Sequence, residues 1–137
     1  MTGGTYDILA EEGSTLTLNF EYQDENGNAV NITDSSNIIE FVVKKTSIKT
    51  DQFMFTMRSD GNDVEGTLEF PTTQNIFGTI TKTGTPTGAF TLIINADTME
   101  NLSLGTYFYS LRLLNGNTVT PLCKGRILVE SKVRWNN

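Results

Sequence analysis

Acidic side chains are the residues of this chain with the clearest capacity for chemistry, because the sequence has no histidine and a single cysteine. Without histidine, neither a Ser-His-Asp triad nor the usual zinc site with His ligands can be built. Paired carboxylates can cleave glycosides, and the candidates near one another are Asp60, Asp63, Glu65 and Glu69. They surround a predicted turn, where acidic residues usually serve solubility. We therefore predict no catalytic residue and no enzyme activity.

A second oxygen-rich stretch, DENGN at 24–28, has the ligand spacing of the first half of a calcium-binding loop. The position that such a loop reserves for glycine is Ala29, and the position of its bidentate glutamate is Ser35. The stretch also contains Asn26-Gly27, which suits the positive φ angles of a tight hairpin turn. We therefore predict a hairpin at this point, and no metal or cofactor anywhere in the chain.

Charge and composition limit the partners of the chain. The formal net charge is −6, whereas binding to nucleic acid or an anionic membrane surface requires clustered Lys and Arg. The cluster formed by Lys44, Lys45 and Lys49 is expected to be a solvated strand end. No apolar run approaches the length of a membrane span, and MTGGTYD at 1–7 is not a secretory signal. Cys123 fits a reducing compartment as a small buried residue, so we expect synthesis in a cytoplasm.

Alternating apolar residues predict that the chain forms β-strands. Leu16, Leu18 and Phe20 alternate with polar residues, which is the period-two pattern of a strand with one face on a core. The stretch 89–114 reads as two strands joined by a helical turn near 96–102, with Asn95 and Asp97 as caps. The side chains that we expect to be nearly fully buried are Leu16, Leu18, Phe20, Phe41, Leu92, Ile94, Tyr107, Tyr109, Leu111 and Ile127.

The chain length of 137 residues suits one domain, which would span 1–137. Phe, Tyr and Thr are abundant relative to Ala and Lys, which favours strands, so the predicted fold class is an all-β, antiparallel sandwich. We expect a flexible lead at 1–5, where two glycines and no large side chain occur, and a C-terminal tail at 131–137.

The order of these motifs resembles a family of small immunoglobulin-like domains of bacteriophage virions. In that family, a strand ending in Ser-Ala-x-Asp-Thr leads through a short helix to Gly-Thr-Tyr-x-Tyr-x-Leu, and here 95–113 read NADTMENLSLGTYFYSLRL. The opening YDILAEEGSTLTLNFEYQDENGNAVNIT at 6–33 and the last strand CKGRILVES at 123–131 also match. Two features depart from the family: 102–105 read LSLG in place of Leu-Pro-Ala-Gly, and 37–74 is longer and more apolar.

The resemblance implies an immunoglobulin-like sandwich at the head of upper-baseplate or tail-fibre proteins. We accordingly expect a virion localisation and a structural role, as a tail or baseplate adaptor or a capsid decoration protein. Its partners would be other virion proteins and identical copies. The alternative function is a carbohydrate-binding module that attaches to a host surface through exposed aromatic residues.

Two segments are candidates for partner binding. Arg134 and Trp135 lie beyond the last predicted strand, and both residue types are enriched in interface cores. For Trp135, packing back onto its own sandwich is the alternative. Phe53, Phe55 and Met57 belong to a stretch with apolar residues on both faces, so these side chains either join the core or contact a neighbour.

Overall fold

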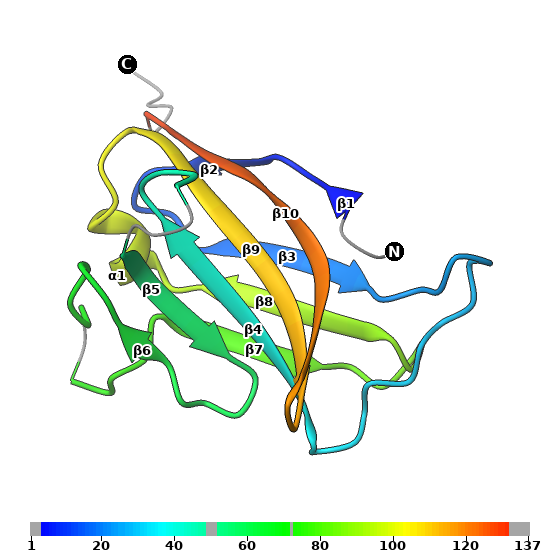
Figure 1. The fold of residues 1–137 in the computed structure, drawn as a ribbon. Helices are drawn as coiled ribbons and strands as arrows, with labels where there is room; N and C mark the ends of the chain where they lie inside the picture. The colour runs from blue at the N-terminus through cyan, green and yellow to red at the C-terminus, as the bar shows by residue number, and fades with distance from the viewer. Residues whose placement is uncertain (1–3, 49–51, 72, 132–137) are drawn as a thin grey trace.

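The computed structural model describes residues 4–48, 52–71 and 73–131, which form two β-sheets packed face to face (Figure 1). The front sheet has the strand order β1-β10-β9-β4-β5-β6, with β2 also paired to β10, and the back sheet has the order β3-β8-β7. The strands are β1 (Gly4–Thr5), β2 (Ile8–Glu11), β3 (Leu16–Glu21), β4 (Asn37–Lys44), β5 (Phe53–Arg58), β6 (Val64–Glu65), β7 (Gly78–Lys82), β8 (Ala89–Ile94), β9 (Gly105–Asn115) and β10 (Thr118–Glu130).

This arrangement is an all-β sandwich, as the sequence predicts. β3, β7 and β8 form one antiparallel sheet, and β4, β5, β9 and β10 form the antiparallel centre of the other. β1 and β2 run parallel to β10, which is the exception to the antiparallel prediction. None of the helices in the described ranges is long and apolar enough to cross a membrane.

The connection between the two sheets contains the predicted helical turn. α1 (Ala96–Glu100) follows β8, and the Tyr107 hydroxyl near the start of β9 donates to the Ser103 carbonyl at 2.6 Å. A buried tyrosine bonded to the backbone a few residues upstream is the tyrosine corner of immunoglobulin-like domains. The predicted side-chain cap is wrong, because the Asn95 side chain makes no capping hydrogen bond.

One apolar core lies between the sheets. Phe41 on β4 is fully buried, and its ring lies 5.3 Å from that of Tyr109 on β9. Cys123 is buried as expected. The predicted burial is confirmed for Phe41, Leu92, Ile94, Tyr107, Tyr109, Leu111 and Ile127. It is wrong for Leu16, Leu18 and Phe20, which are only half-buried. These three side chains lie on β3, which is an edge strand with a neighbour on one side only.

Two tight turns contain a glycine with a positive φ angle. Gly27 has φ +84 in the turn after Asp24, and Gly116 has φ +57 in the β9–β10 hairpin. The strand return predicted after Asn28 is reduced to one bridge, between Gln23 and Ala29. The predicted flexible lead at 1–5 is also wrong in part, because Gly4 and Thr5 pair with Cys123 and Lys124. A strand partner on β10 fixes these two residues despite their small side chains.

Candidate functional site: a basic groove on the front sheet

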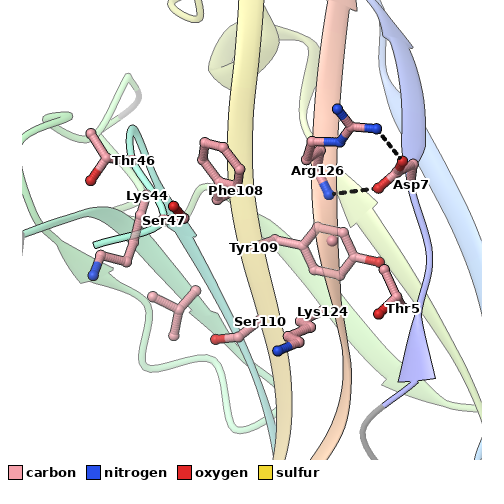
Figure 2. Close-up of a pocket in the computed structure, with 12 residues that line it drawn as sticks. Thr5, Asp7, Lys44, Thr46, Ser47, Phe108, Tyr109, Ser110, Lys124 and Arg126 are labelled. Carbon is pink, nitrogen blue, oxygen red and sulfur yellow. Dashed lines mark hydrogen bonds and ion pairs between the residues drawn. The ribbon is translucent and has the colours of Figure 1, made fainter. Parts of the chain in front are cut away.

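A groove of about 480 Å³ lies on the outer face of the front sheet, and its floor is formed by β4, β9 and β10 (Figure 2). Side chains on these strands point outward at alternate positions, so their register places them in two rows across the sheet. The first row is Lys44, Phe108 and Arg126, and the second row is Val42, Ser110 and Lys124. Phe108 therefore lies between two cations, and Ser110 lies beside a third.

Two walls border this floor. The turn with Thr46 and Ser47 forms one wall, and Lys44 Nζ donates a hydrogen bond to the Ile48 carbonyl in the same turn. Thr5 and Asp7 form the other wall, because β1 pairs with β10. Three strand spacings separate β4 from β1, so the groove is about 14 Å wide from β4 to the wall at β1. Such a width accommodates an extended segment or a hairpin loop of a partner.

The electrostatics of the groove are positive, although the chain as a whole is acidic. Arg126 is neutralised by Asp7, whose carboxylate accepts the Arg126 guanidinium at 2.8 Å and the Arg126 amide at 3.1 Å. These hydrogen bonds lower the pKa of Asp7. Within the described part of the chain, no ion pair involves the exposed Lys124. The exposed Lys124 therefore adds positive charge to the groove.

A carboxylate next to the groove is held by two arginines. Glu40 lies on the outer face of β4 and is 8% exposed, and it accepts hydrogen bonds from Arg112 and, at 3.2 Å, from Arg58. Arg58 also binds both oxygens of Asp60. This chain of charges fixes the side chains across β9, β4 and β5. It lies at the end of the groove floor, because Glu40 and Arg112 form the row after Val42 and Ser110.

The backbone close to the groove is fixed by Tyr109. Its hydroxyl donates to the Tyr6 carbonyl and lies 3.4 Å from Cys123 Sγ. Burial is the main reason why the pKa of Tyr109 is raised, with the Cys123 contact adding to it. A Cβ atom on Gly125 would lie 2.1 Å from the Tyr6 carbonyl oxygen, so glycine is required for this approach. The pairing of β10 with β9 shifts register between Pro121 and Cys123, a few residues before Gly125.

The predicted partner-binding residues do not gather at this groove. Phe55 and Met57 are fully buried in the core, which corrects their assignment to a contact surface, and Phe55 stacks on Phe77 at 4.7 Å. They are buried because β5 continues the front sheet beside β4. Phe53 is half-buried, and its role stays a prediction. Arg134 and Trp135 lie outside the described residues.

Two of the acidic residues considered for catalysis, Asp63 and Glu65, bind backbone amides. Asp63 accepts the amides of Arg58 and Phe77 at 3.1 and 2.8 Å, and Glu65 accepts the amide of Phe70 at 2.8 Å. Among residues 4–48, 52–71 and 73–131, no group of three or more His, Cys, Asp or Glu side chains could hold a metal. Asp24 accepts the amides of Asn26 and Asn28, as expected for a hairpin turn.

Sequence reasoning missed Phe108, Ser110, Lys124 and Arg126 as members of one surface. These residues alternate along β9 and β10 with buried ones, Tyr107, Tyr109 and Leu111 on β9 and Cys123 and Ile127 on β10, which marks them as outward-facing. Only the pairing of β9 with β10 and β4 brings them together. Comparisons with protein-family models and with curated proteins found no match to this chain.

Proposed function

We propose that this chain is a non-enzymatic structural protein of a bacteriophage virion, either a tail or baseplate adaptor or a capsid decoration protein, that acts by docking to other virion proteins. The virion setting rests on the resemblance of 95–113 and 6–33 to the virion domain family. The observation that supports docking is the front groove, which combines a wide floor with cations in an acidic protein.

The groove suits an acidic loop or an extended acidic segment of a partner. Lys124 is exposed and unpaired among the described residues, so it can meet a carboxylate without first losing another partner. Val42 and Phe108 are half-buried and offer apolar contact between the charges. Charge complementarity of this kind gives orientation and faster association as well as affinity.

Cosedimentation with phage particles tests this function. We expect the chain to sediment with purified particles at a fixed ratio, and Lys124→Glu to reduce that ratio, because it places a carboxylate opposite the acidic partner. Lys124→Arg keeps the charge and serves as the matched control. Recovery of the wild-type chain only in the soluble host fraction would refute the proposal.

Carbohydrate binding is the second candidate. The specific observation in its favour is Phe108, which lies between Lys44 and Arg126 in the strand register. Ser110 follows two residues later on β9 and faces the same side of the sheet. An aromatic face flanked by cations and hydroxyl groups fits a sugar that carries a carboxylate. Specific binding of the full chain on an array of acidic glycans, lost in Phe108→Ala, would favour this function over docking to virion proteins.

A further inference from the structure

The edge of the back sheet at β3 has no partner strand among the described residues (Figure 1). Leu16, Leu18 and Phe20 face inward from this strand, yet they are only half-buried. A groove of about 650 Å³ runs beside them, between β3 and the residues Thr5, Tyr6 and Cys123. Tyr6 is 53% exposed there, and its ring meets that of Phe20 edge-on at 6.5 Å. An open strand edge beside an apolar groove is a site where another strand can add.

The surroundings of this edge are acidic. Residues 1–43 contain eight Asp and Glu and no Lys or Arg, and two of these acids, Asp7 and Glu40, are paired with arginines of the front sheet. Glu21 lies at the end of β3 and lines the groove. Glu11 and Glu12 precede β3, and Asp24 and Glu25 follow it. A segment that adds to this edge is therefore favoured if it carries positive charge.

The segment 132–137 has the composition that this edge requires. It reads KVRWNN, so Val133 and Trp135 alternate with Lys132 and Arg134, and its charge is +2. In an extended strand, the two apolar side chains lie on one face and the two cations lie on the other. This segment lies outside the described residues.

We propose that the β3 edge binds segment 132–137 of a second copy of this chain, which adds as a fourth strand to the back sheet. Val133 and Trp135 enter the groove against Leu18, Phe20 and Tyr6. Lys132 and Arg134 lie on the outer face, where β3 presents Thr17, Asn19 and Glu21. The added strand satisfies the free backbone groups of β3 and covers its half-buried side chains.

The reach of the segment identifies a second copy as its source. The described part of β10 ends at Glu130 in the front sheet, paired with Glu11 of β2. To reach β3 of its own chain, the segment would have to pass β2, about 5 Å, and cross to the back sheet, about 10 Å away. Six residues span at most about 20 Å, so only two or three residues could then lie along β3. A segment from a neighbouring copy can place all six.

Each copy offers one β3 edge and one such segment, so the contact is head-to-tail and joins copies into a ring or a chain. This inference adds a second docking surface, the β3 edge, to the front groove of the proposed function. It rests on docking between proteins and does not require the virion setting.

Sedimentation velocity of the full-length chain at about 1 µM to about 1 mM tests this contact, since that range covers affinities typical of weak to moderate association. We expect concentration-dependent association. Glu21→Lys and Arg134→Glu should each weaken it by about tenfold, because each creates a like-charge contact. The double variant should restore it to within about threefold of wild type. Trp135→Ala should weaken it by about 30-fold, as for a buried aromatic anchor.

Glu69→Lys is the matched control, because it makes the same charge change at an exposed position in the connection after β6. A chain that stays monomeric at every concentration would overturn the inference. So would a Glu21→Lys variant that associates as well as Glu69→Lys, or a double variant no better than the single ones. Failure of this contact is distinct from failure of the virion function, which particle cosedimentation measures separately.

Discussion

Inward and outward side chains alternate in the same way in the front and back sheets, yet the inward side chains of the two sheets differ in how deeply they are buried. β4 lies between β9 and β5, and its inward residues Ile39, Phe41 and Val43 are all fully buried. β3 has a neighbour on one side only, and its inward residues are half-buried although their alternation is more regular. Burial of an inward side chain therefore depends on the number of flanking strands as well as on its own hydrophobicity.

The outer faces of the sheets also differ. The four ion pairs of the described residues all involve strands or walls of the front sheet, with Glu40, Arg58, Arg112 and Arg126 as participants. On the outer face of the back sheet, Thr91 instead donates to the neutral Asn19 at 2.8 Å. The front sheet thus carries fixed charges around a groove, and the back sheet carries an acidic open edge. The four predictions below test this contrast.

The largest expected effect is on the core. Phe41→Ala should lower the free energy of unfolding by roughly 3 to 5 kcal/mol, the range for deleting a buried aromatic side chain. Phe20→Ala should cost less, because the Phe20 side chain on the edge strand is only partly buried. Urea unfolding at low protein concentration measures both. Equal losses would show that the β3 edge is covered in solution.

The second prediction concerns the charges of the front face. Glu40→Gln should lower the free energy of unfolding by about 2 kcal/mol. The Glu40 side chain is only 10% exposed, and the substitution removes the negative charge that pairs with Arg112. Glu69→Gln is the control, since Glu69 is exposed. Thermal and urea unfolding of both variants would test the prediction, and an effect of Glu40→Gln as small as that of the control would contradict it.

The third prediction concerns the corner that joins the two sheets. Tyr107→Phe keeps the buried ring but removes the hydroxyl that donates to the Ser103 carbonyl, so it should cost about 1 kcal/mol. Tyr22→Phe is a suitable control on the half-buried Tyr22. If both variants unfold at the same urea concentration, the corner hydrogen bond contributes nothing to stability.

The smallest effects are pH-dependent and opposite in sign. Burial, opposed by the amides of Phe77 and Arg58, raises the pKa of Asp63 above the ordinary value of 3.8. The linked contribution to stability is therefore fully present below the unfolded pKa and is lost as the pH rises through the higher folded pKa. Relative to Asp63→Asn, wild type should gain stability as the pH falls toward 3.8.

Asp60 should behave in the opposite way, because the Arg58 side chain lowers its pKa. Its contribution is present above the unfolded pKa and is lost as the pH falls through the lower folded pKa. Relative to Asp60→Asn, wild type should therefore lose stability below about pH 4. The measurement is the free energy of unfolding of wild type and each variant at a series of pH values. Comparing its slope against pH cancels any pH-independent destabilisation by the amide substitutions. Slopes of the same sign would contradict both assignments.

Much of the fold could be predicted from local pattern. The alternation of Phe90, Leu92 and Ile94 and the turn at Asn115-Gly116 are local signals, and the structure contains the corresponding strand and hairpin. The burial of Phe55 and Met57 was not decided by pattern, because apolar residues on both faces of a strand fit a core and a contact surface equally well. The pairing of β5 with β4 decided it.

The sequence by itself determined the class of fold, the position of the helical turn and the absence of histidine chemistry, because strand periodicity, turn dipeptides and residue types are local properties. Only the tertiary structure decided that Lys44, Phe108, Arg126 and Lys124 share one groove and that β3 is left at an edge. Both facts depend on which strands pair and in what register. Those pairings join residues far apart in the chain, such as Val42 with Ser110, and no local pattern encodes them.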